Sequence, residues 1–358
     1  MLYQTVLLHM QNALAHDRSV SGAYYVLTGK QSIQTIQDAK LFRLEPYYGI
    51  YRSLKKQTYM KQVKKLEDTG LLQAKTTDNH FELTDEGRGF LRDHGKLLQD
   101  YFFQGIHYHT FDRIFYKRLS LFVQVWTNAQ QNNPTYIPVV DDPSITNWVK
   151  QKYRQLKQPA SVYLSKLYEE FNFVFESLQV NEALHIWVRQ LTGYKRIGLT
   201  EQQLAVEYKK SAADIHLLTT SINHMLLNQI NADTSKLPLL SLIAAQEGTA
   251  SRLTKSAQKT AQLLPSHSLE EIAQERCLKL NTIYDHIVEI SLYEAQFPLE
   301  RFVPPPVQIQ IEEAMKQAGS WKLKDIKALL PEQIRYFDIR LVLTHVQSHI
   351  DKGVTQSG

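Results

Sequence analysis

The apolar residues of this chain recur mostly at spacings of three and four, with polar residues between them. This period is typical of amphipathic helices, whereas the alternation typical of strands is confined to a short stretch at 71–83. Gly and Pro, the residues that most often interrupt regular structure, number only 14 and 12 among 358 residues. We therefore predict a mainly α, multi-module helical protein with a small β-wing near its N-terminus.

Changes of composition divide the chain into segments, and we predict one module for each. The second segment is rich in aromatic residues, which indicate either a packed helical core or a partner-binding groove. Three prolines at 304–306 interrupt the last segment, because proline cannot continue a helix. The predicted modules are a winged-helix-like domain at 1–98, an aromatic-rich helical domain at 99–195, a helix-turn-helix-like segment with a linker at 196–254, and a helix-turn-helix domain at 255–352.

A basic helix is predicted within the first module. Residues 52–65 contain six basic residues and no acidic residue, and a helical wheel places Tyr59, Val63 and Leu66 on the opposite face. A DNA recognition helix needs this arrangement, with lysines for phosphates and amide or hydroxyl side chains near base edges. An ordinary solvated helix face would look the same. The predicted DNA-binding residues are Lys56, Gln57, Thr58, Lys61, Lys64, Lys65 and, from the hairpin that follows, Lys75.

A β-hairpin and a capped helix are predicted after the basic helix. A strand beginning near Leu72, a turn at 76–79 ("TTDN") and a second strand with Phe81 and Leu83 facing inward would form a wing. Thr84 is expected to cap the next helix. The stretch from 66 to 91 resembles the corresponding part of MarR-like bacterial winged-helix proteins, which favours a nucleic-acid contact.

The stretch "SLEEIAQERCLKLNTIYDHIVEI" at 268–290 predicts two short helices joined by a tight turn. Ser268 caps the first helix, and Ala273 is small enough for the second helix to cross there. Cys277 lies in the turn and is expected to be buried, and Asn281 is expected to cap the second helix. An ordinary helical hairpin would show the same period. The residues assigned to this unit are Ser268, Ala273, Cys277, Asn281, Thr282, Tyr284 and His286.

The exposed face of this second helix is predicted to be acidic. It would carry Asp285 and Glu289 beside Thr282 and Tyr284, with His286 at its margin and no Lys or Arg. Because phosphates repel carboxylates, contact with DNA and docking of a protein are both open readings of this helix.

An earlier stretch echoes this unit. Shifting residues 199–218 by 68 positions places Thr200 on Ser268 and Ala205 on Ala273, and both copies begin with the pattern of a capping box. Two lysines lie in the turn of the earlier copy. Matches this short also arise by chance between helices, so a structural repeat and a coincidence are both possible.

Charge and cysteine content limit the partners and the compartment. Lys and Arg exceed Asp and Glu by 41 − 36 = 5, which permits a nucleic-acid partner without requiring one. Cys277 is the only cysteine, so no intramolecular disulfide can form and a reducing environment is expected. The chain has no run of 18 apolar residues and begins with a poor signal peptide. We therefore expect a cytoplasmic protein that makes no contact with a membrane.

The sequence gives little indication of a catalytic or metal-binding site. His107 and His109 with Asp112 could bind a metal, but two histidines two residues apart point away from each other on a helix. Asp141 and Asp142 fit a turn and a helix start better than a catalytic pair. The chain lacks a phosphate-binding glycine loop, a nucleophile elbow and an HExxH motif. We expect no enzymatic activity, no cofactor and no bound metal.

Two C-terminal stretches carry a family resemblance. The stretch at 268–290 and "WKLKDIKALLPEQIRYFDIRLVLTHV" at 321–346 resemble the helicase helix-turn-helix domain of some RecQ-type helicases and of YpbB-like proteins. "GKQSIQTIQDAKLF" at 29–42 also looks like the YpbB-like family. The resemblance implies a non-enzymatic DNA-binding accessory of a RecQ-like helicase, with a role in DNA repair. The alternatives are a winged-helix transcriptional regulator acting as a homodimer, and an adaptor that docks a helicase without touching DNA.

Overall fold

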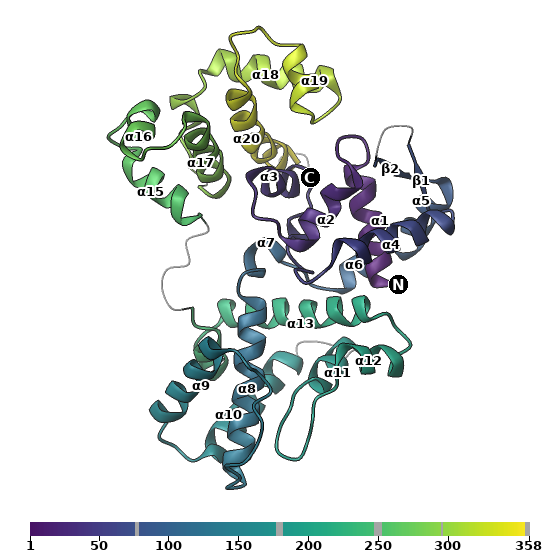
Figure 1. Cartoon of the computed structure of the whole chain (residues 1–358), viewed down its shortest axis with the longest axis vertical. Coiled ribbons are helices and arrows are strands. Elements are labelled where there is room, and N and C mark those ends of the chain that lie inside the picture. Colours follow the sequence, from purple (N-terminus) through teal and green to yellow (C-terminus); the bar gives the residue numbers. More distant parts are fainter. Residues whose placement is uncertain (76–78, 177–181, 247–252, 295, 355–358) are drawn as a thin grey trace.

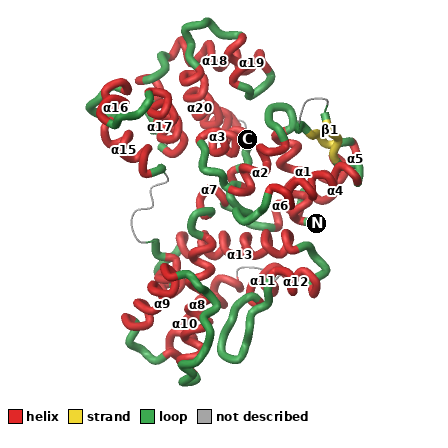
Figure 2. Tube along the Cα trace, viewed as in Figure 1, coloured by secondary structure: helices red, strands yellow, loops and turns green. Residues whose placement is uncertain are grey.

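The chain folds into helices that form an N-terminal, a middle and a C-terminal lobe (Figure 1). The computed structural model describes residues 1–75, 79–176, 182–246, 253–294 and 296–354. Within these residues the chain is mainly helical, with a two-stranded antiparallel hairpin near the N-terminus (Figure 2), which confirms the predicted fold class. None of the helices in these ranges combines the length and apolar character needed to cross a membrane.

The N-terminal lobe packs around α1, which contacts α2, β2, α5 and α6. Apolar residues recur along α1 on several sides, and Val6, Leu7 and Leu8 are fully buried among these elements. The elements of this lobe are α1 (Leu2–Leu14), α2 (Val20–Thr28), α3 (Ile33–Leu41), the 3₁₀ turn η1 (Glu45–Tyr47), α4 (Lys56–Asp68), β1 (Leu72–Ala74), β2 (Phe81–Leu83), α5 (Asp85–His94) and α6 (Leu97–Asp100).

The hairpin follows α4 as the sequence predicts. Leu72 and Leu83 pair across the two strands, and both are buried. Thr84 caps α5 through its hydroxyl, as expected. The carbonyl of Asn79 accepts the first N–H of α2 at 2.8 Å, so the far end of the hairpin is tied to that helix. Residues 76–78, which the sequence assigns to the turn, lie outside the described residues.

The middle lobe is built around α13, a helix of 21 residues that contacts α8, α11, α12 and α14. Aromatic side chains fill its core: Phe122 and Trp126 stack with ring centroids 3.7 Å apart, and buried Trp187 donates to Asn223 of α13 at 2.8 Å. The segments 99–195 and 196–254 therefore share one core. The elements are α7 (Gly105–Tyr108), α8 (Asp112–Gln130), α9 (Pro143–Gln155), α10 (Ala160–Glu176), α11 (Glu182–Arg189), α12 (Glu201–Glu207), α13 (Ala212–Ala232) and α14 (Pro238–Ala244).

The C-terminal lobe places α17 between α15, α16 and α20. The prolines predicted to interrupt this region begin a helix, because Pro304 is the N-cap of α18 and Pro305 is its first residue, where a missing N–H costs nothing. The elements are α15 (Lys255–Leu263), α16 (Leu269–Glu275), α17 (Leu280–Tyr293), the 3₁₀ turn η2 (Leu299–Arg301), α18 (Pro305–Ala318), α19 (Leu323–Ala328) and α20 (Tyr336–Val354).

Helix α3 joins the two ends of the chain. It contacts α17 and α20 of the C-terminal lobe, beside which Figure 1 draws it. The Gln37 amide donates to the carbonyl of Arg340 at 2.9 Å, and the Lys40 ammonium donates to the carbonyl of Leu292. The N-terminal lobe therefore packs directly on a lobe that lies about 300 positions later in the sequence.

Candidate nucleic-acid interface

Helix α4 is held on the N-terminal lobe by one apolar side. Tyr59, Val63 and Leu66 are buried, as the helical wheel predicts. The Tyr59 hydroxyl donates to the carbonyl of Val20 at 2.7 Å and accepts from the Gln11 amide at 2.9 Å, and burial raises its pKa. These contacts fix the rotation of α4, so its opposite side must face solvent.

The solvent side of α4 carries the predicted basic face, but two of the predicted cations, Lys64 on α4 and Lys75 on the hairpin, have acidic partners. The ammonium of Lys64 lies 2.9 Å from Glu67 and 3.1 Å from Asp68, contacts that raise its pKa. Lys75 pairs at 2.7 Å with Glu82 across the hairpin. A phosphate would have to displace these carboxylates. The predicted residues that lie exposed without an acidic partner, within the described part of the chain, are Lys56, Gln57, Thr58, Lys61 and Lys65.

A cleft separates this side of α4 from the turn of the earlier helix-turn-helix copy. This cleft of about 420 Å³ is lined by Lys65 of α4 and by Lys209 and Lys210, the two lysines between α12 and α13. Lys210 pairs with Glu182 at 2.8 Å. Asp214 lines the same cleft, but its carboxylate accepts from the Met1 ammonium at 2.9 Å and from a backbone N–H. The cleft therefore extends the basic surface of α4 into the middle lobe through Lys65 and Lys209.

The C-terminal unit has the helix-turn-helix geometry that the sequence predicts. Ser268 and Glu271 form a complete capping box at the start of α16, and Ala273 is buried where α16 meets α17. The expectation that Asn281 caps α17 is wrong, because the helix begins at Leu280, two residues earlier than expected, and its N-cap is Lys279. Asn281 instead lies exposed in the first turn of α17.

Cys277 is exposed, so the prediction of a buried packing residue is wrong. Its φ of 51° lies in the left-handed region, and its N–H donates to the carbonyl of Gln274 at 3.1 Å. The tight turn requires one residue in this conformation, which directs the side chain out of the lobe. Cys277 therefore serves the turn through its backbone.

Helix α17 is covered along the face that would enter a DNA groove. Tyr284 stacks on Phe337 of α20 with ring centroids 4.2 Å apart, and Asp285 pairs with Arg340 of α20 at 2.7 Å. His286 and Glu289, predicted to be exposed or marginal, are 7% and 4% exposed. The prediction of an exposed face is therefore wrong at His286 and Glu289, which the packing of α17 in the lobe buries, whereas the Asp285 side chain stays 46% exposed and is paired with Arg340.

The buried polar groups of α17 are used inside the lobe. The Glu289 carboxylate accepts from the N–H and the hydroxyl of Thr254, the N-cap of α15. The His286 ring hydrogen-bonds with the hydroxyl of Thr260 at 2.9 Å. The pKa of His286 is lowered, mainly by burial and also by the positive charge of the nearby Arg276. These side chains join α15 to α17. Of the predicted contact residues on α17, Asn281 is exposed and Thr282 is partly exposed.

The two helix-turn-helix copies are a structural repeat. A shift of 68 positions superimposes the bounds of α12 on those of α16 and the start of α13 on the start of α17. Each first helix begins with a capping box, and Lys209, with a φ of 51°, stands where the second copy has Cys277. The backbone hydrogen bonds of the two turns also correspond, residue by residue. The sequence echo is therefore structural.

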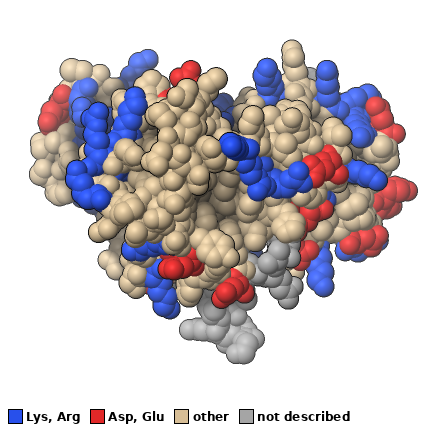
Figure 3. Space-filling model, turned by 90° about the horizontal axis from the view of Figure 1, so that it is seen from below, with Lys and Arg blue, Asp and Glu red and all other residues tan. Residues whose placement is uncertain are grey.

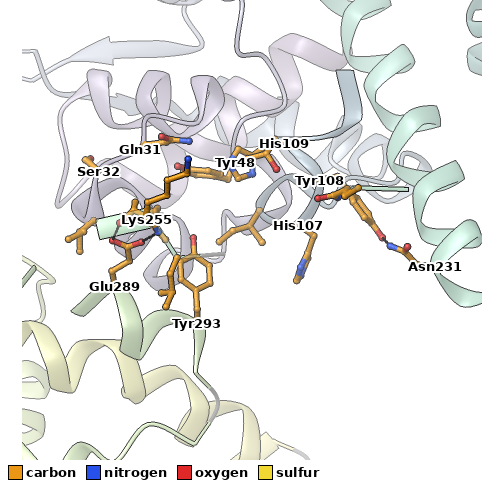
Figure 4. Close-up of a pocket in the computed structure, with 17 residues that line it drawn as sticks. Gln31, Ser32, Tyr48, His107, Tyr108, His109, Asn231, Lys255, Glu289 and Tyr293 are labelled. Atoms are coloured by element: carbon orange, nitrogen blue, oxygen red, sulfur yellow. Dashed lines mark hydrogen bonds between the residues drawn. The ribbon is translucent and has the colours of Figure 1, made fainter. Parts of the chain in front are cut away.

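A central hollow of about 570 Å³ lies where the three lobes meet (Figure 4). His107 and His109 point in different directions there, and the ring of His109 packs edge-on against Tyr48. Burial lowers the pKa of His109. In the described part of the chain, no three His, Cys, Asp or Glu side chains gather as a metal-binding group would require. Asp142 caps α9, as the sequence reading of a helix start expects.

A basic surface on α9 was missed in the sequence. Its sequence signal is the run "KQKYRQLK" at 150–157, in which four of eight residues are basic and none is acidic. A shortage of acids around it is a further signal: residues 113–168 contain eight Lys and Arg and two Asp. This surface lies on the middle lobe, and α4 belongs to the N-terminal lobe (Figure 1).

Comparisons with known proteins agree with this geometry. A helix-turn-helix domain family matches residues 256–343, which run from α15 into α20. The chain is 32% identical over 331 residues to Protein YpbB of Bacillus subtilis (strain 168), a match that covers 92% of this chain and 93% of that protein. No solved structure matches the chain. An identity of this level over nearly the full length of both proteins means that the chain belongs to the YpbB family and carries a helix-turn-helix domain in its C-terminal lobe.

Proposed function

We propose that this protein is a DNA-binding accessory that works with a RecQ-like DNA helicase and catalyses no reaction itself. The observation that supports DNA binding best is the solvent side of α4, where Lys56, Lys61 and Lys65 are exposed without carboxylate partners in the described part of the chain. Lysines in this state can neutralise phosphates and release the counterions that phosphates hold. The helix-turn-helix domain of the C-terminal lobe is a fold often used on DNA and is consistent with the same role.

In the proposed mechanism α4 lies along a duplex and tethers the protein to it. Lys61 and Lys65 contact phosphates, while Gln57 and Thr58, one turn earlier on the same side, approach base edges. Lys209 contributes from the far wall of the shared cleft. Phosphate contacts fix the position of the protein and carry no sequence information, so we expect broad rather than operator-like binding.

The C-terminal lobe is proposed to dock the helicase. Helix α17 is covered by α15 and α20, so it cannot enter a major groove with Tyr284 or His286 unless the lobe opens. The exposed parts of the unit include the outer side of α16, the turn around Cys277 and Asn281 at the start of α17. The helicase itself is proposed from the resemblance of this region to a domain of RecQ-type helicases.

Two measurements on the full chain test the proposal. Fluorescence anisotropy with a 20-base-pair duplex should give an affinity that falls steeply as salt rises from 50 to 200 mM. Sedimentation velocity with the RecQ-like helicase of the same organism should give a joint complex. Helicase binding without duplex binding at 50 mM salt would identify an adaptor, and one strongly preferred operator in footprinting would identify a transcriptional regulator. Absence of both interactions would overturn the proposal.

A further inference from the structure

A strongly basic segment lies within the middle lobe. Residues 113–168 carry a formal charge of 8 − 2 = +6, whereas the whole chain carries +5. Of the two acids in this segment, Asp142 pairs with Lys117 at 3.1 Å and caps α9. In Figure 3, Asp and Glu side chains are more frequent on the right of the face shown, and Lys and Arg predominate on the left, the side on which Figure 1 draws α9.

Helix α9 presents two of these cations directly to solvent. Ile145, Trp148 and Val149 are buried against the lobe, which fixes the rotation of the helix. Lys150 and Arg154, one turn apart, project from the exposed side. In the ranges that the structure describes, neither has a carboxylate within salt-bridge distance, and both therefore remain available to an anionic partner.

Two shallow hollows lie on either side of this pair. The first, of about 490 Å³, is lined by Lys150 and Arg154 together with Tyr136 and Tyr153. The second, of about 510 Å³, is lined by the same two cations and by amide side chains of α9, including Asn147. The two cations thus form a ridge between an aromatic hollow and an amide-lined hollow.

Tyr153 supplies a rigid and accessible ring beside this ridge. It is 49% exposed, although its edge-on contact with buried Trp126, at 5.3 Å between ring centroids, holds it in place. Trp126 is itself stacked on Phe122 in the core of the lobe. A ring supported from below in this way loses little conformational entropy when a flat partner stacks on it.

We propose that the α9 surface, formed by Tyr136, Lys150, Tyr153 and Arg154, binds a single nucleic-acid strand. Cations placed beside an exposed ring match a strand that presents both phosphates and unpaired bases. A duplex would satisfy the cations but would keep its bases stacked away from Tyr153. An acidic peptide would likewise leave the ring without a stacking partner. The α9 surface lies on a different lobe from α4, so this inference goes beyond the duplex tether and stands independently of it.

The test is a fluorescence anisotropy titration of the full chain with labelled dT20 and with a 20-base-pair duplex. Tyr153→Ala should weaken dT20 binding roughly 5- to 150-fold, the range that one base–aromatic stack contributes. Tyr153→Phe keeps the ring and should stay within about twofold of the unchanged protein. Lys150→Ala/Arg154→Ala should lower the slope of log affinity against log salt by about 1.4, which is two single-strand phosphate contacts.

Titration with the duplex distinguishes the α9 surface from the proposed duplex-binding face of α4. The α9 variants should leave the duplex affinity within about twofold, whereas Lys61→Ala/Lys65→Ala should reduce duplex binding and leave dT20 binding nearly unchanged. Lys316→Ala/Lys324→Ala removes the same charge from exposed positions of the C-terminal lobe and should affect neither probe. A thermal melt checks that Tyr153→Ala still folds.

Three results would overturn the inference. One is unchanged dT20 affinity in both α9 variants. Another is an equal loss of dT20 binding in the Lys316→Ala/Lys324→Ala control. The third is that the α9 variants lose binding to poly-glutamate but keep binding to dT20, which would identify a surface for an acidic protein. A parallel titration with rU20 shows whether the strand is DNA or RNA.

Discussion

Alanine substitutions can distinguish the role of Lys61 and Lys65 in DNA binding from that of Lys64, their neighbour on α4. Lys61 and Lys65 have no carboxylate partner within the described residues, whereas Lys64 lies between Glu67 and Asp68. Changing the first two to alanine should therefore remove two phosphate contacts. Changing Lys64 to alanine should remove much less, because any phosphate contact that Lys64 makes must compete with its ion pairs to Glu67 and Asp68.

The expected size follows from counterion release. Each phosphate contact on duplex DNA contributes about 0.9 to the slope of log affinity against log salt, so the double variant should lose about 1.8. The ratio of the affinity of the unchanged protein to that of the double variant should therefore fall about 12-fold when salt rises fourfold, from 50 to 200 mM. For Lys64→Ala the loss of slope should stay below about 0.5.

Anisotropy titrations at four salt concentrations with one labelled duplex measure these slopes. The Lys316→Ala/Lys324→Ala protein serves as the control for lost net charge, since both lysines are exposed in the C-terminal lobe. An unchanged slope in the double variant, or a loss in Lys64→Ala as large as that of Lys61→Ala, would refute the assignment of these lysines to phosphates.

Three further predictions concern the C-terminal lobe. Glu289→Ala leaves the N–H of Thr254 without its acceptor and should lower the free energy of unfolding by about 1–3 kcal/mol in urea titration; an unchanged midpoint would contradict the role of this carboxylate. Cys277→Val places a β-branched residue at a φ of 51° and should be about 1–2 kcal/mol less stable than Cys277→Gly. The native thiol is exposed and should react with Ellman's reagent without unfolding. Equal stabilities of the two variants, or a thiol that does not react, would contradict this description of the turn. Burial lowers the pKa of His286, so the unfolded state binds its proton first and stability should fall as pH drops below about 6.5; His286→Asn should flatten that fall between pH 7.5 and 5.5.

The sequence predicted α4 well because that helix has one covered side and one open side. A period of 3.6 residues then determines which residues are buried, and Tyr59, Val63 and Leu66 follow it. The ion pairs of Lys64 with the acids one turn later could also have been read from the sequence, since residues three and four apart meet on a helix. The pairing of Lys75 with Glu82 depends on the register of the hairpin.

Helix α17 was harder to predict because several elements cover it. The burial of Glu289 depends on Thr254, and the pairing of Asp285 depends on Arg340, contacts separated by 35 and 55 positions. A pattern within one helix cannot reveal such partners. The exposure of Cys277 could have been inferred from the repeat, because the equivalent residue is Lys209 and lysine is rarely buried without a partner.

The candidate site combines residues that the sequence could and could not bring together. The basic face of α4 was found from its charge run, but the cleft that it shares with the lysines between α12 and α13 depends on how the lobes pack. The α9 surface was missed although residues 150–157 hold four basic residues and no acid. The helical period places Lys150 and Arg154 on one side, but the approach of Tyr136, which precedes the helix, depends on the fold.

The contact of α3 with the C-terminal lobe has a consequence for synthesis in the cell. Gln37 leaves the ribosome long before Arg340, its partner 303 positions later. At roughly 5–20 residues per second, this delay is about 15–60 s. During that time the side of α3 that α17 and α20 will cover has no partner from its own chain. The nascent N-terminal lobe is therefore a natural client for a ribosome-associated chaperone, and slow translation would lengthen its exposure.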